Sequence, residues 1–101
     1  MRRYIAQCDE SLSISRIASA APDKFVGKKV DLRGFVGTIY EGHYDLWDKG
    51  GLAAIHIEGN AKRLKENQAV RILGVVIAPI ESLNSNRRVE AYPAVHAVYT
   101  E

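Results

Sequence analysis

The sequence contains very little cysteine. Cys8 is the only one among 101 residues, so an internal disulfide cannot form and zinc sites built from several cysteines are excluded. The three histidines, His43, His56 and His96, fall on separate segments without the spacing of a metal-binding motif. We therefore expect no bound metal and no other cofactor.

Long apolar stretches are also absent. The longest, such as Val75 to Ala78, is far shorter than the roughly 20 residues of a membrane-spanning helix. The first residues, Met1 to Arg3, are not followed by the apolar segment of a signal peptide before Asp9 and Glu10. We expect a protein without membrane association in the cytoplasm, or in the periplasm if a signal peptide has been removed.

The sequence has no strong excess of charge and no catalytic motif. Lys and Arg number 14 and Asp and Glu 12, a formal net charge of +2, which falls short of a typical nucleic-acid-binding domain. It has neither a G-x-S-x-G nucleophile motif nor a glycine-rich phosphate loop. The carboxylates between Glu41 and Glu58 show no spacing typical of a general acid–base pair. We expect a protein that is not an enzyme.

The first pattern that is present is helical. Apolar residues of the segment 14–21 repeat at helical spacing, which predicts a short amphipathic helix over residues 11–21. Ser11 or Ser13 can cap its N-terminus, and Pro22 ends it. Because a helix this short is not stable alone, we expect it to lie against the rest of the domain.

Five strand patterns follow between residues 28 and 99. Gly34 and Gly74 interrupt the first and the fourth, as expected where a strand bends to serve both sides of a small closed sheet. Pro79 is expected to end the fourth strand, and Pro93 indicates an edge or a kink in the fifth. The predicted strands cover residues 28–40, 44–47, 52–58, 69–77 and 88–98, and the predicted connections residues 61–66 and 81–86.

This arrangement resembles an OB-fold, a five-stranded β-barrel, here with one short N-terminal helix. We therefore expect a mostly β protein that forms one domain over residues 1–101. The segment Gly27 to Val36 is similar to the opening strand of anticodon-binding domains in class II aminoacyl-tRNA synthetases.

The chain more closely resembles the small bacterial OB-fold proteins of the BOF family, over residues 14–98. That resemblance implies a link with stress tolerance and no settled chemistry. It also implies export with a signal peptide, which the sequence does not show. The matching segments are Ile14 to Ala21, Val30 to Val36, Tyr44 to Asp48, Gly51, Ala53 to Ile57 and Val70 to Gly74.

Trp47 is the most informative candidate for ligand binding. If Leu46 packs inward, then Trp47 and Asp45 point outward on the second strand. On that face they would lie beside His56 of the third strand and Arg33 of the first. OB-folds often use this face for oligonucleotides, with aromatic rings stacking on bases and cations contacting phosphates. The alternative is that Trp47 packs beneath the helix or a loop.

The connection before the last strand is a second candidate region. Arg87, Arg88 and Tyr92 are plausible polyanion contacts, because the corresponding loop of an OB-fold helps to form its binding cleft. Alternatively, the two arginines are a solvated strand start that prevents edge pairing.

Two functions follow as expectations. The first is a binding module for single-stranded nucleic acid or another polyanion. The second is a protein-interaction or stress-associated accessory domain of the BOF type, which the acidic residues Asp45 and Glu58 favour. The sequence contains no signal for a particular oligomeric state. The candidate ligand-binding residues are Arg33, Trp47, His56, Arg87, Arg88 and Tyr92.

Overall fold

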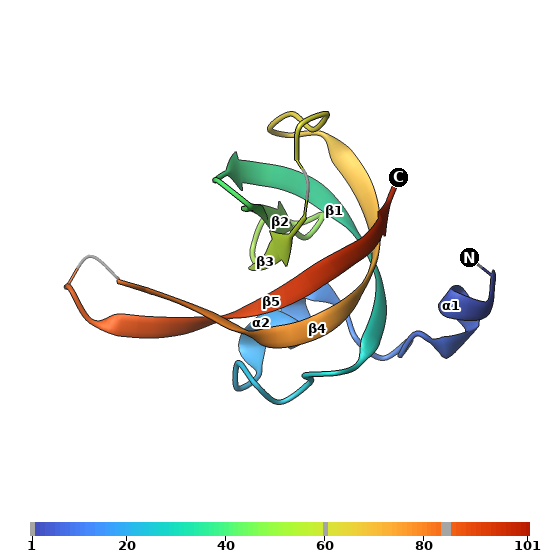
Figure 1. Cartoon of the computed structure of the whole chain (residues 1–101), viewed down its shortest axis with the longest axis horizontal. Helices are drawn as coiled ribbons and strands as arrows, with labels where there is room; N and C mark the ends of the chain where they lie inside the picture. The colour runs from blue at the N-terminus through green and yellow to red at the C-terminus, as the bar shows by residue number, and fades with distance from the viewer. Residues whose placement is uncertain (1, 60, 84–85) are drawn as a thin grey trace.

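Five strands close into a barrel whose order is β1-β2-β3-β5-β4, as Figure 1 shows. This computed structural model describes residues 2–59, 61–83 and 86–101. Neighbouring strands are antiparallel, and among the described pairs only β3 and β5 run parallel. The prediction of a mostly β, five-stranded OB-type barrel is therefore confirmed. The strands are β1 (Lys29–Ile39), β2 (His43–Trp47), β3 (Ala54–Glu58), β4 (Ala69–Leu83) and β5 (Val89–Thr100).

The inward-facing side chains fill the barrel with apolar groups. Tyr44 and Leu46 of β2 are buried, as are Ile55 and Ile57 of β3, because alternate residues of a strand face opposite sides. Their inward orientation agrees with the predicted alternation. The core cluster consists of Leu12, Ile14, Ile17, Val30, Leu32, Val36, Tyr44, Leu46, Ile55, Ile57, Val70, Ile72, Val76 and Val95.

β1 joins the two sides of the barrel. Its residues 29–35 pair with β4, and its residues 35–39 pair with β2. The predicted bend at Gly34 falls where one partner strand gives way to the other. A Cβ atom at Gly34 would lie 2.2 Å from the carbonyl oxygen of Trp47, so a side chain there would force β1 and β2 apart.

The predicted helix of residues 11–21 forms only over α2 (Ile14–Ser19). Its N-cap is Ser13, whose hydroxyl oxygen accepts a hydrogen bond of 3.2 Å from the amide of Arg16. Ser11 does not take this role; its amide and its hydroxyl both donate to Asp9.

Contacts with the barrel hold both helices, through packing for α2 and through hydrogen bonding for the other. α2 buries Ile14 and Ile17 and contacts β3 and β5. A second helix, α1 (Arg2–Gln7), was not predicted, because its residues are mostly polar and lack an apolar stripe. It is held to the barrel by the Tyr4 hydroxyl, which donates a hydrogen bond to the Gly74 carbonyl. No helix within the described ranges is long and apolar enough to span a bilayer.

The prediction that the fourth strand ends at Pro79 is wrong, because β4 continues to Leu83. Ala78 and Pro79 together lie opposite the single residue Pro93 of β5, so the register shifts there as in a bulge. A bulged residue makes no ladder hydrogen bond, and the missing N–H of proline therefore costs nothing at this position. Pairing resumes beyond the bulge.

The continued pairing creates a two-stranded ribbon that extends away from the barrel (Figure 1). We call residues 78–83 and 86–93 the β4–β5 arm. Residues 81–83 of the predicted loop are therefore strand, whereas residues 84 and 85 lie outside the described part of the chain. The arm provides one wall of the site described next.

Candidate functional site

A groove of about 630 Å³ lies on the outer face of the barrel, between the β2–β3 hairpin and the base of the β4–β5 arm. We call it the aromatic groove. Leu52 of the β2–β3 connection, apolar residues of β3 and β4, and Pro93 complete its lining. Its aromatic and charged lining residues are Tyr40, His43, Asp45, Trp47, His56, Glu81 and Tyr92.

Strand alternation explains why these side chains meet. His43, Asp45 and Trp47 occupy every second position of β2 and face outward, whereas the residues between them are buried. Register then places His56 of β3 directly beside Asp45. Tyr92 comes from β5, at the base of the arm.

Four rings form a continuous row across the groove. Tyr40 stacks on His43 with ring centroids 4.7 Å apart and an interplanar angle of 18°. His43 meets the edge of His56 at 5.3 Å, and His56 meets the edge of Tyr92 at 5.4 Å. Both stacked and edge-on contacts are favourable geometries for aromatic pairs. The row therefore adds side-chain contacts between β2, β3 and β5, which are also paired through their backbones.

Trp47 lies at one end of the groove and is 38% exposed. Its indole rests on Gly37 of β1, where a Cβ atom would lie 2.5 Å from the indole Nε1. Trp47 therefore points outward, as one of the two sequence interpretations expected, and rests on β1 in place of packing beneath the helix or a loop.

The charge in the groove is negative. Asp45 Oδ1 lies 3.2 Å from His56 Nδ1, although this contact lacks the alignment of a hydrogen bond. Burial lowers the pKa of His56, and the nearby Asp45 carboxylate only partly opposes that effect. His56 is therefore neutral near pH 7 and does not cancel the charge of Asp45. Among the described residues, no lysine or arginine lines the groove.

Cations gather on an adjoining surface. Arg33 and Lys49 are exposed and line a depression together with Phe35; we call these three residues the cationic shelf. Phe35 is the register partner of Trp47 across β1 and β2, and both rings line a further depression with Lys49. The shelf is thus continuous with the aromatic groove through Trp47.

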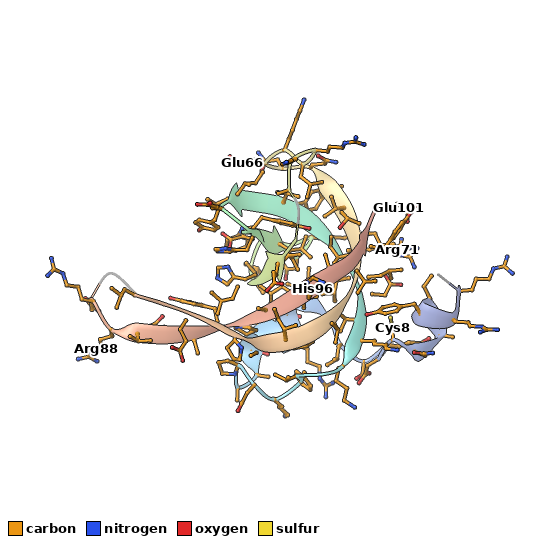
Figure 2. The ribbon with its side chains drawn as sticks, viewed as in Figure 1. Cys8, Glu66, Arg71, Arg88, His96 and Glu101 are labelled. Atoms are coloured by element: carbon orange, nitrogen blue, oxygen red, sulfur yellow. The ribbon has the colours of Figure 1, made fainter. Side chains whose placement is uncertain are left out.

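Arg71 also borders the shelf but is bound to carboxylates. Its guanidinium donates hydrogen bonds of 2.8 and 2.7 Å to Asp31 and lies 3.8 Å from Glu101. Figure 2 shows Arg71 and Glu101 side by side at the end of β5. Its charge is largely matched within the barrel wall, which leaves Arg33 and Lys49 as the outward-facing cations of the shelf.

The structure brings together only some of the predicted site residues. Trp47, His56 and Tyr92 line the aromatic groove, and Arg33 lies next to it on the shelf. The other two, Arg87 and Arg88, precede β5 at the tip of the arm and do not line the groove. Figure 2 shows Arg88 at the far end of the arm from the barrel.

Four residues of this surface were missed by sequence reasoning. His43 could have been found, since it is separated from Trp47 by an even number of positions and therefore faces the same side of the strand. Tyr40 was assigned to the end of the first strand but lies just beyond β1. Lys49 stands in a connection whose path the sequence does not specify. Glu81 was placed in a loop because Pro79 was taken as the end of the strand. Within the described ranges, no three His, Cys, Asp or Glu side chains are grouped closely enough to hold a metal ion.

Comparisons with known proteins bear on the fold. No protein-family model matches the chain, and no curated protein does. Among solved structures, the chain is similar to one described as the crystal structure of the S. pombe Stn1–Ten1 complex. The TM-score is 0.57 at 15% sequence identity, and the match covers 89% of this chain and 71% of that one. A likeness at this identity shows the fold alone, and it supports an OB-fold for almost the whole chain.

Proposed function

We propose that this chain is a non-catalytic OB-fold module that binds single-stranded nucleic acid. Bases stack on the rings of the aromatic groove and on Trp47, and phosphates contact Arg33 and Lys49 of the cationic shelf. The observation that carries the proposal is the continuity of these two surfaces through Trp47 and Phe35. Aromatic platforms beside a cationic track are the usual means by which OB-folds hold single strands.

The free energies expected from base stacking are sufficient for measurable binding. A base stacked on an aromatic side chain contributes about 1–3 kcal/mol, and the groove and shelf offer several rings. A longer strand would also reach the arm, where Arg87 and Arg88 supply further phosphate contacts. We therefore expect binding that depends on strand length up to the span of the groove, shelf and arm.

Fluorescence titration tests the proposal directly. Trp47 is the only tryptophan in the chain, so intrinsic emission reports on the site itself. Single-stranded oligonucleotides added at about 50 mM salt should quench this emission, and affinity should fall steeply as salt rises because bound phosphates release counterions. Absence of quenching, together with unchanged anisotropy of a labelled oligonucleotide, would refute the proposal.

Substitution of single residues separates the two surfaces. Trp47→Ala should weaken binding by about 1–3 kcal/mol with little change in salt dependence. Arg33→Ala should reduce the slope of log affinity against log salt by roughly one phosphate contact. Equal effects of both substitutions on the slope would contradict the assignment of stacking to Trp47.

A protein partner is the second candidate function. Two observations favour it: the carboxylates of Asp45 and Glu81 line the groove, and the arm exposes an apolar pair, Leu83 and Val89, at 65% and 67%. On this alternative the chain is an accessory domain of the BOF type, and a stable partner should co-purify with the wild type but not with Trp47→Ala. We also propose a relationship to the BOF family, a likeness to anticodon-binding domains and a cytoplasmic location.

A further inference from the structure

We propose that the aromatic groove selects bases that present amino groups, guanine above all, and disfavours thymine and uracil. This inference rests on the proposed function, because it concerns which bases enter a groove that binds single strands. It follows from the charge and the hydrogen-bonding groups of the groove, which are unusual for a surface that meets a polyanion.

The groove offers acceptors rather than cations. Asp45 stands on one wall and Glu81 of the arm on the other. Across the described residues, neither carboxylate meets a lysine or arginine at ion-pair distance. The neutral His56 leaves the negative charge of Asp45 in place. A base edge that donates hydrogen bonds is therefore favoured, whereas one that presents carbonyl oxygens is repelled.

The carboxylate of Asp45 is placed where it can meet the edge of a stacked base. Its two oxygens lie among the rings of the row: Oδ1 is 3.2 Å from His56 Nδ1, and Oδ2 accepts a weak hydrogen bond of 3.4 Å from the Tyr40 hydroxyl. Each carboxylate oxygen has two lone pairs, so both retain capacity for a further donor. A base stacked on these rings would bring its edge to the carboxylate.

The four bases differ in what they present to such a group. Guanine carries two adjacent donors, the N1 and N2 hydrogens, and one carboxylate can accept both in parallel. Cytosine and adenine each offer one exocyclic amino group, and acidic side chains are known acceptors for cytosine N4. Thymine and uracil have a single N–H between two carbonyl oxygens, so a carboxylate gains one bond and meets two like dipoles.

The test compares oligonucleotides of one length. Anisotropy is measured with labelled strands of about 12 nucleotides: oligothymidine, oligocytidine, and oligothymidine in which two central bases are guanine. We expect the guanine-containing strand to bind at least about fivefold more tightly than oligothymidine, the lower bound for a good bidentate base contact. Oligocytidine should fall between them.

Two substitutions assign the preference to the groove. Asp45→Asn replaces an acceptor by an amide that both donates and accepts. The ratio of the affinity for the guanine-containing strand to that for oligothymidine should therefore fall towards one, mainly through tighter binding of oligothymidine. Glu81→Gln should act in the same direction from the other wall. Glu58→Gln is the matched control: Glu58 loses the same charge but pairs with His96 outside the groove, so affinities should rise equally and the ratio should persist.

The outcomes separate the two proposals. Oligothymidine that binds as tightly as the guanine-containing strand, or a ratio unchanged in Asp45→Asn, overturns the base preference and leaves nucleic-acid binding intact. Failure of every oligonucleotide to bind refutes the proposed function itself. Capture of an arginine-rich peptide in place of any oligonucleotide overturns both and favours a protein partner.

Discussion

At the scale of single residues, Gly37 determines where the indole of Trp47 lies. The ring occupies the space that any side chain at position 37 would need. A glycine on β1 thus serves the site through a residue on β2. Its role is to position the aromatic platform, because glycine has no side chain with which to contact a ligand.

Gly37→Ala should therefore displace the indole without unfolding the barrel. We expect a shift in Trp47 emission and weaker oligonucleotide binding, by at most the roughly 1–3 kcal/mol of one stacked base. Gly50→Ala is the control, because a Cβ atom at Gly50 meets nothing closer than 3.9 Å. Identical emission and affinity in the two variants would show that Gly37 does not position the ring.

Tyr44 carries a polar atom into the apolar core. It is 1% exposed, and among the described residues its hydroxyl has no hydrogen-bond partner in good geometry. Burial raises the pKa of Tyr44, and the nearby Thr100 hydroxyl only partly opposes this.

Tyr44→Phe should accordingly leave stability unchanged or raise it by up to about 1 kcal/mol, because an unsatisfied buried hydroxyl is itself destabilising. Chemical denaturation of the variant measures this. A loss of more than about 1 kcal/mol would mean that the Tyr44 and Thr100 hydroxyls form a hydrogen bond in solution.

At the scale of elements, the β4–β5 arm is the feature that the sequence predicted least well. Proline is a strong signal for the end of a strand, and Pro79 was interpreted in that way. The bulge opposite Pro93 removes the conflict, but a bulge depends on pairing between segments distant in the sequence. The wall formed by Glu81 and Tyr92 could not be derived without that pairing.

Elements with a local signal were predicted much better. The outward parity of β2, the buried alternation of β3 and the cap region of α2 all follow from residues within a few positions of one another. α1 was missed because it lacks an apolar stripe and is attached through long-range hydrogen bonds, from the Tyr4 hydroxyl to Gly74 and from Lys29 to Gln7. Of the candidate site, Trp47 and His56 were within reach of sequence reasoning for the same reason of alternation.

Arg87 adopts a left-handed backbone conformation at the turn of the arm, with φ of 57°. Asparagine tolerates this region better than arginine, so Arg87→Asn should keep or slightly raise the melting temperature. If the arm contacts phosphates, the same variant should bind long strands more weakly and reduce the salt slope by about one. A variant with unaltered salt dependence would exclude Arg87 from the interface.

At the scale of the whole molecule, one ion-pair cluster joins β1, β4 and the C-terminus. Arg71 binds Asp31 through two hydrogen bonds and approaches Glu101. Arg71 lowers the pKa of Asp31, chiefly through these hydrogen bonds. A carboxylate with a lowered pKa stabilises the fold above its unfolded pKa of about 3.9 and loses this contribution as pH falls.

Melting temperatures measured from pH 7 down to about pH 3 should reveal that contribution. The wild type should be more stable than Asp31→Asn at neutral pH, and the difference should shrink as acid protonates Asp31. Parallel curves for the two proteins across this range would show that the ion pair does not contribute to the acid sensitivity of the fold.

The parallel pairing of β3 with β5 has a consequence for dynamics. It comprises three register pairs, from His56 with Ala94 to Glu58 with His96, and the ring contact between His56 and Tyr92 spans the same junction. A ligand bound across these rings would stabilise the pairing of β3 with β5 and suppress the transient separation of the two strands. Amide deuterium uptake along residues 54–58 and 94–96 should then slow when the ligand binds. Unchanged uptake would mean that the ligand binds elsewhere.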